Sequence, residues 1–307
     1  MAEAVIELRR VAKSYRSKPA VKDLELEVPR GSVTGLVGPN GAGKTTTIRM
    51  ILGLERPSSG SLRVLGLDPV DAAVEVRRRV GYVPESHHMY PWMTADQLLD
   101  FASDVYPTFS ASECERVVGL LGVPRDRKVK QMSRGEVAKL ALTMALSHRP
   151  ELLVLDEPTS GLDPLIRRDF LRAIVDLVHD DPTRTVLFSS HILSDVERIA
   201  DRVVVLVRGE VRLAETMESL ERRYTRASFL FPVPPGDELT IPGALSVERA
   251  RREWIALFPE RSDEELEATA QAIGARDVLR LPMSFDDVFA ELVEHSASEA
   301  ELRDVSI

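Results

Sequence analysis

The chain has 307 residues and contains 40 lysine and arginine residues against 49 aspartate and glutamate residues, so its formal net charge is −9. This acidity argues against a protein that coats nucleic acid by neutralising phosphates. The single cysteine, Cys114, excludes a disulfide within the chain and a zinc site built from several cysteines, so we expect a reducing compartment.

No apolar run approaches the roughly 20 residues of a membrane-spanning helix, and the N-terminus lacks the pattern of a secretion signal. We therefore expect a cytoplasmic chain. If the protein works at a membrane, another chain must cross it.

The first 85 residues predict short strands separated by glycine and proline. The strand-like segments are residues 5–8, 24–28, 32–37 and 61–64, and a helix is predicted over residues 44–54. A strand, a glycine-rich turn and a helix in this order are typical of an α/β nucleotide-binding fold.

Residues 91–150 predict helices. Thr94 with Gln97 and Ser110 with Glu113 both fit the capping box S/T-x-x-E/Q, which satisfies free amides at a helix start. We interpret this region, about residues 88–150, as an all-helical subdomain inserted into the α/β core. The α/β pattern resumes in the apolar runs 152–155, 185–188 and 203–207, which are typical of parallel strands buried on both faces.

The core is predicted to cover residues 1–215, and residues 216–307 form a separate α+β unit. That unit is expected to open with the proline-rich stretch FPVPPGDELTIPG and to continue with strand 254–258, helix 263–273, strand 278–281 and helix 285–293. Residues 1–215 hold 30 acids and 30 bases, whereas residues 216–307 hold 19 acids and 10 bases. The whole excess of negative charge therefore belongs to the C-terminal unit.

Residues 38–45 match the pattern G-x-x-x-x-G-K-[ST] at every fixed position, directly after a predicted strand and at the start of a predicted helix. Such a loop folds around an anion, with its backbone amides pointing at the phosphates. Lys44 would reach the β- and γ-phosphates, and the hydroxyl of Thr45 would bind Mg²⁺. The strand and helix around the loop disfavour a chance match. The predicted ATP-binding residues here are Gly38, Pro39, Asn40, Gly41, Ala42, Gly43, Lys44, Thr45 and Thr46.

Residues 152–157 place two acids, Asp156 and Glu157, after four apolar residues. A buried strand that carries Asp156 at its tip can complete the Mg²⁺ shell, and Glu157 can polarise an attacking water. Acids at a strand end are often no more than solvated loop residues. The phosphate loop upstream favours the catalytic interpretation.

With these motifs the chain resembles the ATP-binding subunits of ABC transporters, and the resemblance covers residues 4–215. A weaker resemblance, at residues 284–289, is to the ends of ATP-binding subunits from bacterial exporter-type systems with a separate permease subunit. The other motifs behind the resemblance are a signature sequence, a D-loop, a switch histidine and an aromatic residue that stacks on adenine. The signature corresponds to Ser133, Arg134, Gly135 and Glu136, and the D-loop to Ser160, Gly161, Leu162 and Asp163. The switch histidine corresponds to His191, and the stacking aromatic residue to Tyr15.

The resemblance implies a P-loop NTPase (RecA-like) core with N-terminal antiparallel β strands. It also implies ATP and Mg²⁺ as cofactors, with Thr45, Asp156 and Glu85 at the metal and Glu157, His191 and Lys44 in catalysis. The signature residues would contact the ATP of a second subunit, in a homodimer or a heterodimer. An integral membrane permease would be driven from the cytoplasmic face, and we expect no nucleic-acid partner.

Each of these residues also has a simpler interpretation. Ser133 and Glu136 form another capping box, so Ser133 can be a helix cap alone. His191 can be a satisfied polar residue at a strand end, and Tyr15 a half-buried surface aromatic.

Two departures from the family pattern stand out. Arg134 and Glu136 replace the usual glycine and glutamine of the signature, and Glu85 replaces the usual glutamine of the Q-loop. Arg134 can add a phosphate contact, whereas Glu136 would oppose the phosphate charge. A carboxylate at position 85 still offers a hard oxygen to Mg²⁺.

The loop after Glu85 carries two adjacent histidines, His87 and His88, and an apolar, aromatic patch at residues 89–92. We interpret the histidines as an exposed loop, since no third ligand is clustered with them. In the family this region lies near the groove that receives a helix of the membrane subunit. The patch is therefore a partner surface or a local core.

The alternative function is a soluble ABC ATPase that acts on nucleic acid or ribosomes. Such proteins carry long coiled coils, two tandem cassettes or cysteine-rich zinc modules, and none of these patterns is found in this sequence. A P-loop kinase or GTPase would leave the signature, the D-loop and His191 unexplained.

Overall fold

The computed structural model describes residues 3–16, 18–181, 183–236 and 238–293. The chain divides into two compact units, Met1–Ala214 and Glu215–Ile307. Each unit has its own sheets and its own apolar core.

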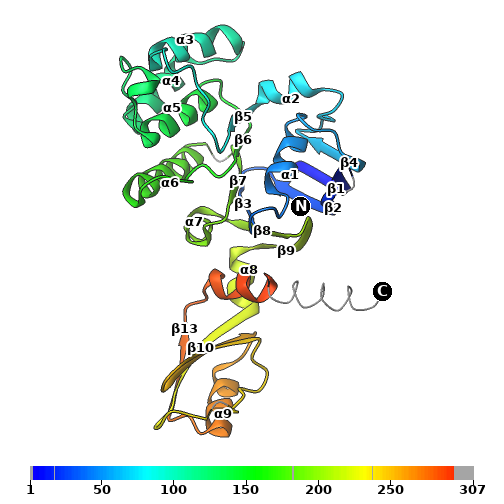
Figure 1. Ribbon diagram of the computed structural model, residues 1–307, viewed down its shortest axis with the longest axis vertical. Coiled ribbons are helices and arrows are strands. Elements are labelled where there is room, and N and C mark those ends of the chain that lie inside the picture. The colour runs from blue at the N-terminus through cyan, green and yellow to red at the C-terminus, as the bar shows by residue number, and fades with distance from the viewer. Residues whose placement is uncertain (1–2, 17, 182, 237, 294–307) are drawn as a thin grey trace. The chain divides into compact units, whose positions relative to one another are not determined.

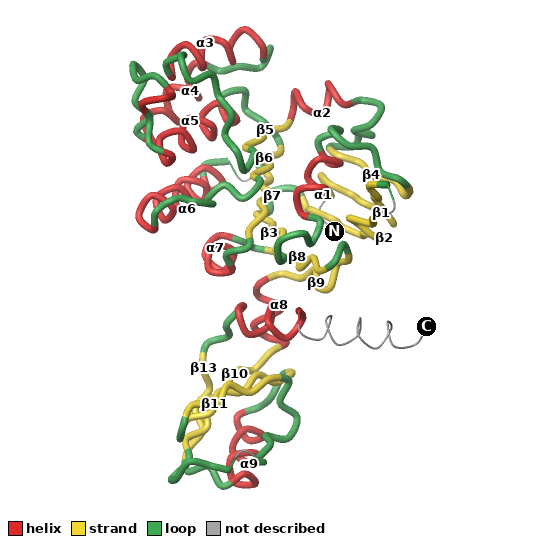
Figure 2. Tube along the Cα trace, in the orientation of Figure 1, coloured by secondary structure: helices red, strands yellow, loops and turns green. Residues whose placement is uncertain are grey.

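Two sheets form the framework of the first unit (Figures 1 and 2). An antiparallel sheet has the order β2-β1-β4, and a six-stranded sheet has the order β5-β6-β7-β3-β8-β9. Strands β5, β6, β7, β3 and β8 are parallel neighbours. The bounds are β1 (Ala4–Tyr15), β2 (Lys18–Pro29), β3 (Val33–Val37), β4 (Ser59–Val64), β5 (Val80–Val83), β6 (Leu152–Leu155), β7 (Thr185–Ser190), β8 (Arg202–Val207) and β9 (Glu210–Thr216).

The parallel strands β6, β7 and β8 are built around apolar runs because both of their faces are covered, as those runs predicted. All four residues of β6 and all six of β7 are buried. Helix α1 (Lys44–Ile51) and the antiparallel sheet lie on one side, and α6 (Pro164–His179) and α7 (Leu193–Ile199) lie on the other (Figure 1). The loops after β3, β5, β6 and β7 carry most of the residues discussed below.

The helices α3 (Ala95–Val105), α4 (Ala111–Leu121) and α5 (Arg134–Leu146), with the short η1 (Val129–Gln131), stand between β5 and β6 in the chain and group together in space (Figure 1). Thr94 and Ser133 close full capping boxes at α3 and α5. At α4 the predicted box is only half formed. Ser110 accepts from the Glu113 amide, but the Glu113 carboxylate accepts from Arg116 instead.

Several predicted bounds in the first unit were wrong. Strands β1 and β2 run 12 residues each, because their pairing continues past irregular positions that interrupt the sequence pattern. Helix α1 ends at Ile51 rather than at residue 54, since Gly53 takes a left-handed backbone (φ 64°) that ends the helix. The helices α2 (Ala73–Arg79), α6 and α7 were not predicted.

The second unit is a four-stranded antiparallel sheet of order β11-β12-β10-β13 with helices. Its elements are α8 (Met217–Arg223), β10 (Tyr224–Leu230), β11 (Ser246–Ala250), β12 (Glu253–Pro259), α9 (Asp263–Ile273), β13 (Asp277–Leu281) and a helical segment at 285–293. The unit does not open with the proline-rich stretch, because α8 and β10 precede it. Phe229, Trp254 and Phe258 form its core with Leu266 of α9.

Candidate functional site

The phosphate-binding loop joins β3 to α1, as predicted. Gly43 stands at the N-cap of α1 with φ 108°, and a Cβ there would lie 2.7 Å from the carbonyl oxygen of Ala20. Only glycine fits such a position, because it tolerates both the left-handed backbone and the close approach. The loop therefore ends with backbone amides free at the start of a helix, where the dipole favours an anion.

A cavity of about 600 Å³ opens at this loop. It is lined by Tyr15, Lys18, Pro19, Ala20, Asn40, Gly41, Ala42, Gly43, Lys44, Thr45, Thr46, Glu85, Glu157, Ser160 and His191. Most of the predicted nucleotide-binding residues thus meet at one cavity. Gly38 and Pro39 do not line the cavity but bond to residues that do. The carbonyl of Gly38 accepts from Lys44 Nζ at 2.7 Å, and the carbonyl of Pro39 accepts from the Ala42 amide at 3.1 Å.

Tyr15 lies at the rim of the cavity, where β1 ends. Its side chain is exposed, and Lys13 Nζ lies 5.1 Å from the ring centroid. An exposed ring beside the phosphate loop is suited to stacking on a flat base.

Glu157 lies between the ammonium group of Lys44 and the imidazole ring of His191. Lys44 Nζ is 3.2 Å from Glu157 Oε1, with both side chains less than a tenth exposed. His191 Nδ1 is 2.7 Å from Glu157 Oε2, and the His191 amide donates to the same oxygen at 3.3 Å. Glu157 also has a left-handed backbone, with φ 48°. Such strain in a residue other than glycine is held by its surroundings and concentrates at functional sites.

The Asp156 carboxylate is bonded to the hydroxyls of Thr45 and Ser189. Ser189 Oγ donates to Asp156 Oδ1 at 2.7 Å, and Thr45 Oγ1 donates to the same oxygen at 3.4 Å. Burial raises the pKa of Asp156, while the hydrogen bonds from Ser189 and Thr45 lower it. The hydroxyl of Thr45 and the carboxylate of Asp156 are hard oxygen donors, which is the donor set that Mg²⁺ prefers.

The signature residues stand at the start of α5. Ser133 Oγ accepts from the Glu136 amide at 3.2 Å, and Glu136 Oε2 accepts from the Ser133 amide at 2.7 Å. Arg127 also donates to Glu136 at 2.6 Å. The bonds from Ser133 and the charge of Arg127 hold the pKa of Glu136 below its usual range.

In the described part of the chain, none of the four signature residues lines the 600 Å³ cavity. Arg134 lines a second cavity of about 420 Å³, together with Glu85, Ser160, Gly161 and Leu162. Glu85 and Ser160 line both cavities, whereas Asp163 caps α6 by accepting from the Leu165 and Ile166 amides. The signature residues of the described chain therefore stand outside the cavity at its own phosphate loop.

The loop after Glu85 is partly exposed. His88 is exposed and His87 half-buried, and burial lowers the pKa of His87. Among the described residues, no group of three or more histidines, cysteines and acids is placed to hold a metal ion. Tyr90 and Trp92 are 48% and 64% exposed, so they form a surface rather than a core.

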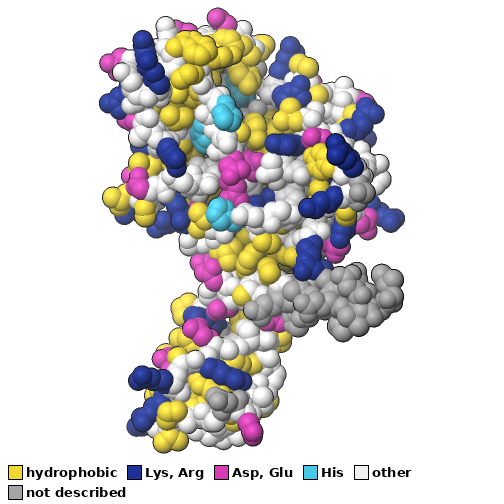
Figure 3. All heavy atoms as spheres, in the orientation of Figure 1, with side chains coloured by type: hydrophobic (Ala, Val, Ile, Leu, Met, Phe, Trp, Pro, Cys, Tyr) yellow, Lys and Arg dark blue, Asp and Glu magenta, His cyan; other side chains and the backbone are white. Residues whose placement is uncertain are grey.

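Sequence reasoning missed Ser189 as a functional residue. Its fully buried hydroxyl donates to Asp156 and accepts from the Glu157 amide at 2.9 Å, so it holds both acids in place. The sequence shows the serine pair before His191, but not the contacts of Ser189 with Asp156 and Glu157, which are 33 and 32 positions away. On the face drawn in Figure 3, acidic and histidine side chains gather near the centre of the first unit.

The parallel sheet, the glycine-rich loop at a helix start and the two acids at the end of β6 define a P-loop NTPase. The sequence profile of the family described as ABC transporter matches residues 21–160.

Two curated relatives and one solved structure agree with this match. The uncharacterized ABC transporter ATP-binding protein YdbJ of Bacillus subtilis (strain 168) is 34% identical over 230 residues, 74% of each chain. YtrB, an ABC transporter ATP-binding protein of the same organism, is 28% identical over 285 residues, covering 93% of this chain and 97% of YtrB. The solved structure of an ATP-binding subunit of an ABC transporter matches with a TM-score of 0.64 at 30% identity, covering 71% of this chain and 92% of that chain. This chain belongs to the ABC transporter family, as an ATP-binding subunit with ATPase activity.

Across the described ranges, no helix has both the length and the apolar character needed to cross a membrane.

Proposed function

We propose that two nucleotide-binding subunits, identical or different, close on MgATP, hydrolyse it and thereby drive a separate integral membrane permease from its cytoplasmic face. The supporting observation is the position of the signature. The N-terminus of α5 carries Ser133, which is exposed and stands outside the cavity that holds Lys44. A γ-phosphate on the phosphate loop would therefore meet the signature of a second subunit.

The first step is the release of Glu157 from Lys44. In the present arrangement Lys44 is satisfied by Gly38 and Glu157. Phosphate oxygens compete for the same ammonium group, and they also gain the amides of residues 40–46. When Lys44 turns to the phosphates, Glu157 keeps its contact with His191 and is left to accept a proton from water.

The remaining residues hold the nucleotide. Tyr15 would stack on the base, and Thr45, Asp156 and Glu85 would hold Mg²⁺ through their oxygen atoms. When bound, the metal ion neutralises charge on the β- and γ-phosphates. Ser189 keeps Asp156 in place, and His191 senses the γ-phosphate while it orients Glu157.

Ultracentrifugation with ATP tests the dimer. Glu157→Gln should slow hydrolysis and accumulate a nucleotide-bound dimer. Adding Ser133→Arg should remove most of that dimer while each monomer still binds ATP, because the bulky cation blocks the signature surface.

Ser110→Arg is the control, since the Ser110 hydroxyl accepts from the Glu113 amide at the start of α4 as the Ser133 hydroxyl accepts from the Glu136 amide at the start of α5. Either substitution costs the cap about 1 kcal/mol. Equal dimer fractions for the two arginine variants would refute the role of the signature.

The permease is proposed to dock beside the loop after Glu85. A cavity of about 360 Å³ there is lined largely by apolar and aromatic residues, including Leu52, Tyr82, Met89 and Met144. Trp92, 64% exposed, stands in the same loop region. Aromatic residues exposed around an apolar cavity are typical of partner surfaces.

Affinity purification from solubilised membranes tests this docking. The tagged chain should recover an integral membrane protein, Trp92→Ala should recover much less, and Leu279→Ala, at a side chain 65% exposed in the second unit, should recover as much as wild type. Recovery of ribosomes or DNA alone would contradict the proposal.

A further inference from the structure

Asp195 of α7 is a buried carboxylate with two short hydrogen bonds. Its side chain is 3% exposed. Oδ2 accepts from Thr159 Oγ1 at 2.6 Å, and Oδ1 accepts from Arg167 Nε at 2.6 Å. Arg167 also donates to Ser194 Oγ at 2.9 Å. Both carboxylate oxygens are therefore used, as a buried charge requires.

These bonds join three segments that carry the proposed chemistry. Asp195 follows His191 by four residues, and Thr159 follows Glu157 by two. Arg167 lies one helical turn after Asp163, whose carbonyl accepts from its amide at 2.9 Å. Asp195 thus ties the His191 segment both to the chain leaving Glu157 and to the helix after the D-loop.

The contact between His191 and Glu157 depends on how these segments are held. The side chain of His191 is 44% exposed, so packing constrains its ring little. The ring nevertheless has to stay 2.7 Å from Glu157 Oε2. Charge-assisted bonds are short and directional, so the Asp195 bonds limit the movement of α7 relative to Thr159.

We propose that Asp195 is a positioning residue, which holds His191 against Glu157 through its bonds to Thr159 and Arg167. The inference rests on the proposed function of His191 and Glu157. It does not assign Asp195 any contact with nucleotide.

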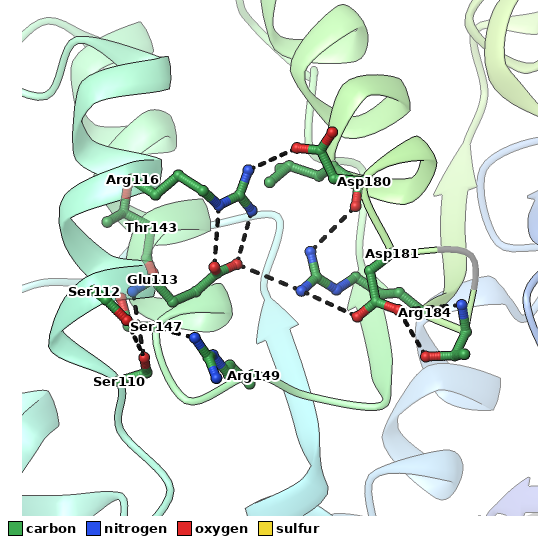
Figure 4. Close-up of polar contacts among 12 residues, drawn as sticks. Ser110, Ser112, Glu113, Arg116, Thr143, Ser147, Arg149, Asp180, Asp181 and Arg184 are labelled. Atoms are coloured by element: carbon green, nitrogen blue, oxygen red, sulfur yellow. Dashed lines mark hydrogen bonds and ion pairs between the residues drawn. The ribbon is translucent and has the colours of Figure 1, made fainter.

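Glu113 provides a matched control in the same unit. Its carboxylate, 10% exposed, accepts from Arg116 at 2.8 and 3.1 Å and lies 3.4 Å from the buried Arg184 (Figure 4). This network joins α4 to residues near β7 and contains neither His191 nor Glu157. Glu113→Gln therefore weakens a comparable buried pair away from the proposed chemistry.

Steady-state ATPase kinetics would be measured for Asp195→Asn, Thr159→Val, Thr159→Ser and Glu113→Gln, with thermal melts to confirm folding. A small displacement of reacting groups can cost about a hundredfold, so Asp195→Asn and Thr159→Val should lower kcat by about ten- to a hundredfold while KM stays nearly constant. Thr159→Ser, which keeps the hydroxyl, should retain the wild-type rate, and so should Glu113→Gln. The Thr159 pair keeps the test decisive if Asp195→Asn fails to fold.

The deciding measurement combines Asp195→Asn, or Thr159→Val in its place, with His191→Ala. If Asp195 acts through His191, adding Asp195→Asn or Thr159→Val to the His191→Ala chain should lower its kcat by no more than about twofold. An equal loss in both backgrounds, or a Glu113→Gln loss as large as that of Asp195→Asn, would show a general structural role and overturn the inference. If His191→Ala is slow but Asp195→Asn and Thr159→Val turn over at the wild-type rate, the inference about Asp195 fails while the proposed role of His191 stands. Wild-type turnover in His191→Ala overturns the proposed role of His191 and this inference with it.

Discussion

Removing the hydroxyl of Ser189 should destabilise the first unit more than the loss of one buried hydroxyl ordinarily does. Ser189→Ala deletes the donor to the Asp156 carboxylate at 2.7 Å and the acceptor of the Glu157 amide at 2.9 Å. Ser189 is fully buried, so water does not replace either partner in the packed structure.

The two losses set the size of the effect. A hydrogen bond to a charged group contributes about 1.5–3 kcal/mol, and a stranded buried amide costs about 1–3 kcal/mol. Their sum predicts a loss of about 4 kcal/mol in the free energy of unfolding. For a unit of this size, 1 kcal/mol shifts the Tm by about 2–4 °C, so the expected decrease is about 8–16 °C.

Ser147→Ala is the control, since Ser147 is equally buried and its hydroxyl donates to the neutral carbonyl of Thr143 at 2.6 Å. That substitution should cost about 1 kcal/mol. Urea unfolding followed by far-ultraviolet circular dichroism measures both variants. A Ser189→Ala loss no larger than that of Ser147→Ala would refute the anchoring of the two acids by Ser189.

Two further predictions concern single residues of the site. Tyr15→Ala should weaken ATP binding about tenfold, because stacking of a base on an aromatic ring contributes about 1–3 kcal/mol; Tyr15→Phe should bind as wild type in calorimetry, and equal affinity for the alanine variant would remove Tyr15 from the site. Asp156→Asn should raise the Tm of the nucleotide-free protein at neutral pH, because burial raises the pKa of Asp156 in the folded state and its ionised form therefore costs stability. The difference should narrow as the pH falls through that raised pKa, and a Tm below wild type at neutral pH would contradict the direction of the shift.

The phosphate loop could be predicted from the sequence because its chemistry is local. Residues 38–45 are continuous, and the glycine and lysine positions each have a backbone or charge requirement that the pattern itself states. The parallel strands β3, β6, β7 and β8 were equally visible, since burial on both faces leaves an apolar run such as residues 152–155, whereas β5 (Val80–Val83) was not predicted.

The contacts that hold the site together are long-range and were not predictable in the same way. Asp195 lies in an ordinary polar helical segment, and its burial follows from Thr159 and Arg167, which are 36 and 28 residues away. Helix α6 was missed although its signal is local. Asp163 followed by Pro164 is a typical N-cap and first helical position, and the same aspartate also fits the D-loop motif.

In the second unit, β10 (Tyr224–Leu230) was not predicted, although it directly precedes the proline-rich stretch at which that unit was expected to begin. Thr225, Ala227 and Phe229 alternate with Arg226 and Ser228, which is the period of a half-buried strand. This pattern was available in the sequence.

The rate of ATP hydrolysis by Glu157→Gln tests the central claim most directly, namely that Glu157 activates the attacking water in the cavity at the phosphate loop. Glutamine keeps the shape of the side chain but cannot take up the proton. Loss of a general base lowers turnover by about 10²- to 10⁴-fold, with ATP binding retained. Hydrolysis by Glu157→Gln at the wild-type rate, with ATP bound normally, would contradict the account.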